Sequence, residues 1–263
     1  MSTPPIGSTP PNGSAPPNGS APLAGTTALA GKTVLVTGAS RGIGKALVEE
    51  ALRRGAARVY AGTRGPLAHD DARVVPLELD ITDRDEILGA ARQVGQLDVL
   101  VNNAGIALFD DLSDRAVLEQ HLAVNLFGPY EVIQAFLPQL ARSRGAIVNN
   151  TSMMALAPFP VTPAYAISKA AAFNFTQSLR AIVKAKGISV HAVLTGPTDT
   201  DMTRGYEIPK ETPQAVARAI FDGVERGEED IFPDPMSQAL AESWNGGAAK
   251  AFERQFAQAV QAA

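Results

Sequence analysis

The sequence has no cysteine among its 263 residues. Disulfides, thiolate metal sites and cysteine nucleophiles are therefore excluded. Histidine is nearly as scarce, since only His69, His121 and His191 occur, far apart and without the spacing of metal ligands. We interpret these three as surface or packing residues and expect no structural metal.

A surplus of positive charge is also missing. The formal net charge is -4 and the sequence pI is about 5.5. No basic field is available to gather phosphate backbones, so we expect no nucleic-acid partner.

Residues 1–29 lack any charged side chain and carry PPNGSA twice in tandem. A tract rich in proline, glycine and serine cannot bury enough apolar surface to offset its ordering entropy, so we expect a disordered tail. It has neither a basic segment nor an apolar run of the kind found in secretory signals. We therefore expect a cytoplasmic protein without a membrane anchor.

Hydrophobic residues make up 45% of the chain and charged residues 19%, enough for a full core. From Lys32 onward, short apolar runs alternate with helical patterns. The expected strands are TVLVTG, RVYAGT, RVVPLELD, LDVLVNNAG, AIVNNTS, ISVHAVLTGP and a short DIFPDP. The expected helices lie near 42–54, 83–94, 113–140 and 213–226, with one more in PAYAISKAA at 163–171. This alternation predicts an α/β fold, a Rossmann-like doubly wound parallel sheet with helices on both faces, as a single domain over residues 30–263.

Glycines follow the first expected strand in TGASRGIG, at Gly38, Gly42 and Gly44. Glycine lets the backbone turn sharply and approach a pyrophosphate, and the helix N-terminus that follows offers free N–H groups. This pattern predicts a dinucleotide site.

The second expected strand indicates which dinucleotide binds. NAD sites commonly place an acidic residue about 20 positions beyond the glycines, where it holds the ribose 2′-hydroxyl. Here that position is Arg64, preceded by Thr63, and Arg41 lies inside the glycine loop. Two cations and no carboxylate favour an extra phosphate, so we predict NADP(H).

Tyr165 and Lys169 stand four residues apart at the start of a predicted helix, with Thr162 as N-cap and Pro163 as first residue. This spacing puts both side chains on one helical face. A fixed ammonium stabilises a phenolate, so we expect the pKa of Tyr165 to be lowered enough for general acid and base work.

Taken with TGASRGIG, the NNAG stretch at 102–105, Ser152 and VNLFG around Asn125, this pair resembles the short-chain dehydrogenase/reductase family over about residues 30–203. The resemblance implies a catalytic tetrad of Asn125, Ser152, Tyr165 and Lys169. The cofactor-binding residues that we expect, from the glycine loop and the resemblance together, are Gly38, Ser40, Arg41, Gly42, Ile43, Gly44, Thr63, Arg64, Asp80, Ile81, Asn103, Ala104, Gly105, Tyr165, Lys169, Gly196, Thr198 and Thr200.

Two parts of the chain depart from the family pattern. Thr195 stands where proline is usual, which makes the turn before Gly196 less rigid. The segment after Asp234 matches no closing motif of the family. The resemblance further implies a homo-oligomer, dimer or tetramer, built on the Asn125 and Tyr165 helices, with Phe136, Leu140, Phe173 and Phe175 as contact residues.

The predicted reaction is hydride transfer between NADP(H) and a carbonyl or secondary alcohol, as in a carbonyl reductase. Apolar residues follow the serine and the cofactor turn, which favours a hydrophobic ketone or aldehyde. They are Met153, Met154, Leu156, Phe159, Met202 and Tyr206. Two alternatives remain open: an NADP(H)-binding regulator without turnover, and an NAD-dependent alcohol dehydrogenase.

Overall fold

The computed structural model describes residues 28–261, so most of the predicted tail lies outside the described residues. At Leu29 the predicted boundary is wrong, because this side chain is fully buried in the core beside Val34 and Leu52. The packed domain therefore begins before residue 30.

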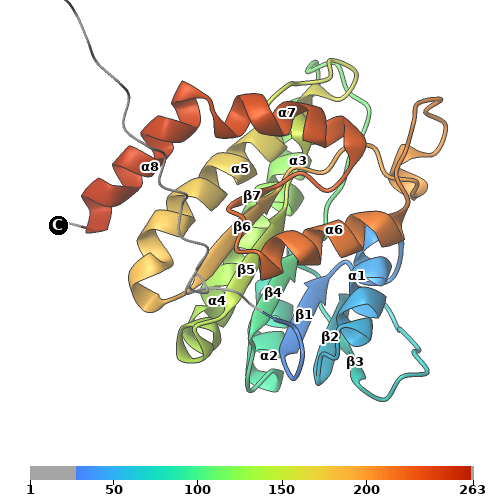
Figure 1. Cartoon of the computed structure of the whole chain (residues 1–263). Coiled ribbons are helices and arrows are strands. Elements are labelled where there is room, and N and C mark those ends of the chain that lie inside the picture. Colours follow the sequence, from blue (N-terminus) through green and yellow to red (C-terminus); the bar gives the residue numbers. More distant parts are fainter. Residues whose placement is uncertain (1–27, 262–263) are drawn as a thin grey trace, which may run out of the picture.

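A seven-stranded, wholly parallel sheet forms the centre of the domain (Figure 1). Its strands lie in the order β3-β2-β1-β4-β5-β6-β7. Their bounds are β1 Thr33–Thr37, β2 Arg58–Thr63, β3 Val74–Glu78, β4 Val99–Asn102, β5 Ala146–Asn150, β6 Ser189–Val193 and β7 Asp230–Ile231. The strand order reverses between β1 and β4, which confirms the doubly wound fold.

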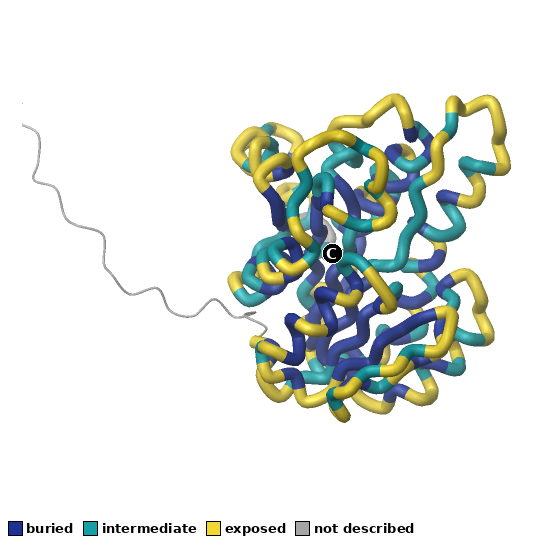
Figure 2. The backbone as a smooth tube through the Cα atoms, turned by 90° about the vertical axis from the view of Figure 1, so that its right-hand side faces the viewer, coloured by how far each residue is buried: buried dark blue, intermediate teal, exposed yellow. Residues whose placement is uncertain are grey.

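Successive side chains of each strand point to opposite faces of the sheet, and both faces are buried. Val34 and Val36 of β1 join the cluster under α1 (Gly42–Arg53) and α6 (Pro213–Glu225), whereas Leu35 joins the cluster under α2 (Arg84–Gln93), α4 (Gly128–Ser143) and α5 (Pro163–Val183). Figure 2 shows the buried strands in the middle and exposed loops at the rim. The near-continuous apolar runs in the sequence follow from this two-sided burial.

The long helix expected over 113–140 is interrupted. It begins as α3 (Arg115–Leu122), passes through a π-helical turn (Ala123–Phe127) and continues as α4. The predicted cap at Ser113 is wrong, because the Asp114 carboxylate accepts the hydrogen bond from the Ala116 N–H at 2.8 Å. The interruption coincides with Asn125, whose side chain bonds outside the helix.

Two helices occupy the segment after Asp234, α7 (Pro235–Asn245) and α8 (Ala248–Gln261), and α8 lies along α5 (Figure 1). The fully buried Lys250 Nζ fixes α8, lying 3.0 Å from Glu229, 2.7 Å from Asp230 and 2.6 Å from Glu253. These contacts pair the Lys250 ammonium with three carboxylates at once. Burial alone would raise the pKa of Asp230, but the positive charges of Arg180 and Lys250 hold it below its ordinary value.

Within residues 28–261, no helix is both long and apolar enough to cross a bilayer.

Candidate active site

The loops after β1 and β4 meet at the point where the strand order reverses. Gly38 has a φ of 66°, and a Cβ at this position would lie 2.9 Å from the Ala104 Cα. Asn103 donates from its backbone N–H to the Thr37 hydroxyl at 3.0 Å and from its side chain to the Thr37 carbonyl at 3.1 Å. The predicted glycine loop and the NNAG stretch therefore form one packed unit at the carboxyl edge of the sheet.

Arg64, one of the two cations predicted to bind the extra phosphate, follows the last residue of β2. Arg64 is exposed, while Thr63 is buried and donates its hydroxyl to the Gly65 carbonyl at 2.6 Å. Hydrogen bonds from Thr82, and secondarily the charge of Arg64, lower the pKa of Asp80. The side chain of Ile81, the next residue, is buried in the core.

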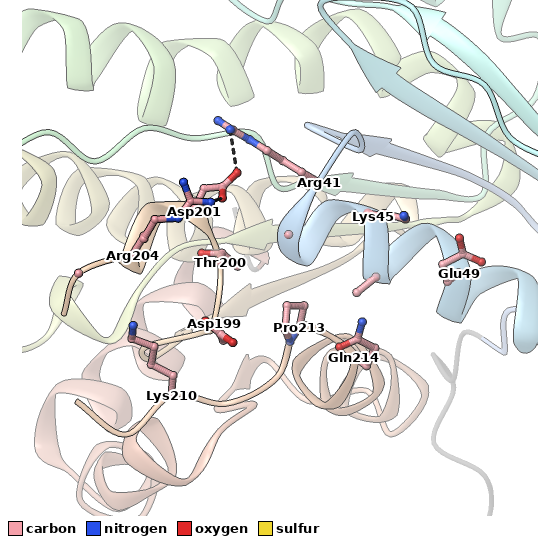
Figure 3. Close-up of a pocket in the computed structure, with 13 residues that line it drawn as sticks. Arg41, Lys45, Glu49, Asp199, Thr200, Asp201, Arg204, Lys210, Pro213 and Gln214 are labelled. Atoms are coloured by element: carbon pink, nitrogen blue, oxygen red, sulfur yellow. Dashed lines mark hydrogen bonds and ion pairs between the residues drawn. The ribbon is translucent and has the colours of Figure 1, made fainter. Parts of the chain in front are cut away.

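Arg41, the second predicted cation, reaches across to the loop after β6. Its Nη1 lies 3.0 Å from the carboxylate of Asp201, which also pairs with Arg204. Figure 3 shows this contact at the rim of a cavity of about 560 Å³ between α1, α6 and the 199–205 loop. Gly42 and Thr200 line the same cavity, and a Cβ on Gly42 would lie 3.1 Å from the Thr200 methyl group.

Tyr165 and Lys169 lie on the same side of α5, as their spacing predicts. The Lys169 Nζ is 5.7 Å from the centroid of the Tyr165 ring, and His121 packs edge-on against that ring at 6.4 Å. Thr162 is the N-cap residue, but its side chain makes no capping bond. The Asp110 carboxylate accepts from the Ala164 N–H at 3.2 Å instead.

The pKa of Tyr165 differs from the expectation, and that of Lys169 is shifted as well. Burial raises the pKa of Tyr165, and a hydrogen bond with Ser152 only partly opposes it. Burial also lowers the pKa of Lys169, from 10.5 to about 8. The expected lowering of the Tyr165 pKa is therefore wrong for the protein alone, because the cost of placing a phenolate in the buried site exceeds the help from its neighbours.

The lowered pKa of Lys169 makes a prediction about stability. Between pH 8 and 10.5 the unfolded chain binds more protons at this lysine, so the destabilisation caused by its buried charge is complete below pH 8 and fades toward pH 10.5. The difference between the Lys169 pKa values of the unfolded and the folded chain corresponds to about 3 kcal/mol of destabilisation. Losing the hydrogen bond from Lys169 to the Asn150 carbonyl costs about 1 kcal/mol. We expect Lys169→Met to raise the free energy of unfolding by about 2 kcal/mol at pH 7.

Urea unfolding at several pH values checks this. The advantage of the methionine variant should shrink as the pH rises from 8 to 10.5. An advantage that stays constant across this range would contradict the buried ammonium as its source.

Asn125 projects from the π-helical turn into the site. Its Oδ1 accepts from the Ile106 N–H at 2.9 Å, and its Nδ2 donates to the Ile106 carbonyl and to the Ser168 hydroxyl, each at 2.9 Å. A Cβ on Gly105 would lie 3.1 Å from the Asn125 Oδ1 and 3.6 Å from the Lys169 Nζ. Asn125, Gly105 and Lys169 are thus neighbours, and Asn125 and Lys169 line a small cavity of about 10 Å³, roughly the size of one water.

Ser152 and the turn after β6 close the far side of the site. The Ser152 hydroxyl donates to the Thr195 carbonyl at 3.3 Å and accepts from the Met154 N–H at 3.1 Å. Thr198 is buried, and its carbonyl accepts from the Thr203 hydroxyl. The structure therefore brings the four predicted catalytic residues together and sets the predicted cofactor turn next to them.

Exposed apolar side chains surround the mouth of the site. Phe109, 70% exposed, stacks on Tyr206 with ring centroids 5.7 Å apart, joining the loop after β4 to the loop after β6. Met202 and Phe159 are also exposed there, whereas Leu156 packs under the loop against α7. Of the two nearby cations, Arg204 pairs with Asp201, and the Lys210 Nζ donates to the Thr203 carbonyl at 2.7 Å.

Sequence reasoning missed several residues that this geometry depends on. They are Phe109, Asp110, Asn150, Asp201 and Asp234. Each acts through a contact distant in sequence, so no local pattern marked it.

Comparison with known proteins agrees with this geometry. The family model described as short chain dehydrogenase matches residues 32–210. The chain is 38% identical to a short chain dehydrogenase, pigC, of Monascus ruber over 217 residues, covering 71% of this chain and 72% of that protein. It is 33% identical to the 11-beta-hydroxysteroid dehydrogenase-like 3 protein of Arabidopsis thaliana over 219 residues, covering 74% and 71%.

Among solved structures, a short chain dehydrogenase from Burkholderia cenocepacia in complex with NADP is 33% identical and superposes with a TM-score of 0.80. The match covers 87% of this chain and 98% of that one. The family model covers more than half of the chain, and the relatives share more than 30% identity with it. The site also lies at the switch point of a doubly wound sheet. The chain therefore belongs to the short-chain dehydrogenase family and is an oxidoreductase.

Proposed function

We propose that this protein transfers a hydride between NADP(H) and a carbonyl or secondary alcohol substrate, with Tyr165 as the general acid and base. One observation supports this proposal most strongly. The Tyr165 ring, the Lys169 ammonium 5.7 Å from its centroid and the Ser152 hydroxyl share one site beside the glycine loop.

The residues at the carboxyl edge of the sheet fit a dinucleotide phosphate. The glycine loop opens the N-terminus of α1, and Arg41 and Arg64 supply positive charge, with no acidic residue from Ala57 to Pro66. Gly105 and Thr200 border the same edge from the loops after β4 and β6. When bound, NADP(H) supplies or accepts the hydride, and its oxidised ring adds positive charge beside the phenol.

Tyr165 gives its proton to the substrate oxygen during reduction and takes it back during oxidation. Ser152 orients that oxygen by a hydrogen bond. Lys169 favours the tyrosinate by its charge. Asn125 holds the backbone of the Ile106 loop and, with Lys169, lines the small cavity, in which one water can carry protons to Lys169. These roles follow the tetrad that the family resemblance implies.

The apolar mouth favours a hydrophobic ketone or aldehyde. Phe109 and Tyr206 present stacked rings, and Met202 adds a flexible apolar side chain. Neither nearby cation is free, because Arg204 and Lys210 are bonded to the loop itself. An acidic substrate is therefore disfavoured.

A screen of ketones and aldehydes for NADPH consumption tests the proposal. We expect turnover of large apolar carbonyl compounds and weak activity with small or acidic ones. NADPH binding without consumption across such a panel would favour a regulatory NADP(H)-binding protein instead.

Cofactor choice is tested with the two arginines. Charged hydrogen bonds are worth about 1.5–3 kcal/mol, so Arg64→Gln and Arg41→Gln should each weaken NADPH binding about tenfold and leave NADH binding unchanged. Nicotinamide fluorescence measures both affinities. Arg58→Gln is the matched control, since Arg58 is exposed at the opposite end of β2. Tighter binding of NADH than of NADPH by the unmodified protein would favour the NAD-dependent alternative.

The proposal includes a homo-oligomer, but three of its four predicted contact residues are wrong, whereas Phe175, on α5, is only partly buried and stays a prediction. Phe136, Leu140 and Phe173 are buried in the core of their own subunit and are not available. The exposed apolar residues on the π-helical turn, α4 and α5 are Phe127, Tyr130, Ile167 and Ile182. Light scattering of the purified protein determines whether copies associate.

A further inference from the structure

Asn150, the last residue of β5, connects three parts of the site. Its carbonyl accepts from the Lys169 Nζ at 2.8 Å, and its Nδ2 donates to the Asn103 Oδ1 at 3.1 Å. Its Oδ1 accepts from the Thr195 hydroxyl at 2.5 Å. The side chain of Asn150 thus ties the turn after β6 to the NNAG loop, while its backbone holds Lys169.

The same turn is held from the opposite side by Asp234. The Gly196 N–H donates to the Asp234 Oδ2 at 2.7 Å, and the buried carboxylate also accepts from the Ser237 N–H and hydroxyl, at 3.0 and 2.8 Å. A Cβ on Gly196 would lie 2.2 Å from the Asp234 Oδ1, so glycine is required for this approach. The N-cap of α7 is therefore also a clamp on the turn.

These contacts restrain a turn whose own backbone is flexible, because Thr195 occupies the position where proline is usual. Threonine at 195 leaves φ free to vary, whereas proline would fix it. Two acceptors from β5 and from the start of α7 restrain consecutive residues of the turn, Thr195 and Gly196. A turn that is restrained before the cofactor binds loses less conformational entropy on binding.

We infer that Asn150 and Asp234 are positioning residues that preorganise the Thr195–Thr198 turn for the cofactor. The inference rests on the proposed function, because it assigns the turn to NADP(H). Since the Asn150 backbone, not its side chain, holds Lys169, removing the side chain should weaken cofactor binding far more than it slows proton transfer.

The test is a double-mutant cycle at the bond between Thr195 and Asn150. Thr195→Val and Asn150→Ala should each raise the NADPH dissociation constant about fivefold by nicotinamide fluorescence. The double variant should be no worse than either single one, because both remove the same bond. Thr195→Ser keeps the hydroxyl and should bind within twofold of the unmodified protein. In Thr195→Val the loss should be larger in NADPH affinity than in kcat at saturating NADPH.

Thr151→Val is the matched control. Thr151 is buried at the same junction and donates its hydroxyl to the Val193 carbonyl at 2.6 Å, but it does not contact the turn. It should leave NADPH binding unchanged. Equal binding by Thr195→Val and the unmodified protein, or an equal loss in Thr151→Val, would overturn the inference.

Hydrogen exchange without cofactor separates this inference from the proposed function. Amides of residues 195–200 should exchange several-fold faster in Thr195→Val and Asn150→Ala than in the unmodified protein and in Thr151→Val. If the unmodified protein fails to bind NADPH, the proposed function is wrong, and the exchange rates still decide whether the turn is restrained. Unchanged exchange in both variants would overturn the restraint itself.

Discussion

Replacing Tyr165 with phenylalanine should lower NADPH-dependent turnover about 10³-fold while NADPH still binds. General acid and base catalysis contributes about 10²–10⁴-fold, and the hydroxyl is the only group that this change removes. The phenylalanine ring keeps the packing against His121 and Lys169. Initial rates with an accepted ketone, together with nicotinamide fluorescence for binding, measure the two effects separately.

Tyr130→Phe is the matched control, because it makes the same chemical change at a tyrosine on α4 that contacts Phe175 rather than the site. It should leave the rate within twofold. Turnover by Tyr165→Phe equal to that of the unmodified protein would remove this phenol from the mechanism, whatever carbonyl compound is used.

The parts of the site that sequence reasoning predicted depend on short-range spacing. Four residues along a helix placed Tyr165 and Lys169 on one side, and the glycines after β1 marked the turn into α1. These relations follow from backbone geometry, so they hold before the tertiary structure is known. The parallel sheet with helices on both faces was likewise predicted from the alternation of strands and helices.

What the sequence did not predict depends on long-range contacts. Asp110 caps α5 from more than 50 residues away, and Asp201 pairs with Arg41 across the cavity. The π-helical turn around Asn125 arises because that side chain bonds to the Ile106 loop and Ser168. The pKa of Tyr165 depends on burial, which helical spacing does not give.

Three of the four predicted oligomer contacts, Phe136, Leu140 and Phe173, were wrong for a related reason. Helical periodicity identifies apolar faces but does not show which one packs on the sheet of the same chain. Phe136 and Leu140 lie on the sheet-facing side of α4, whereas Phe127 and Tyr130 are exposed. The tertiary structure is needed to tell which apolar face of a helix is buried in the core and which is exposed.

The C-terminal segment matched no family pattern, and its anchor is electrostatic. Lys250, Arg180 and Arg254 face Glu229, Asp230 and Glu253, three positive charges against three negative ones. The Trp244 Nε1 adds a bond to the Asp230 Oδ2 at 2.8 Å. Only the pair of Lys250 and Glu253, three residues apart on α8, is local, and the other pairs join segments that are distant in sequence.

Lys250→Met should therefore cause a large loss of stability. Removing one partner of a fully buried ion pair leaves uncompensated charge and costs about 3–5 kcal/mol. The Asp230 side chain is fully buried and would keep only Arg180 and Trp244 as partners. We expect the free energy of unfolding to fall by about 3 kcal/mol in urea titrations at pH 7.

Arg254→Met provides the control from the same cluster, because Arg254 is 55% exposed and lies 3.4 Å from Glu229. Exposed pairs contribute about 0–1 kcal/mol, so its effect should be at the lower end of that range. Equal losses in the two variants would mean that burial of Lys250 does not set its contribution. No loss in Lys250→Met would mean that methionine packing replaces the ion pairs, and that α8 is held by apolar contacts with α5 instead.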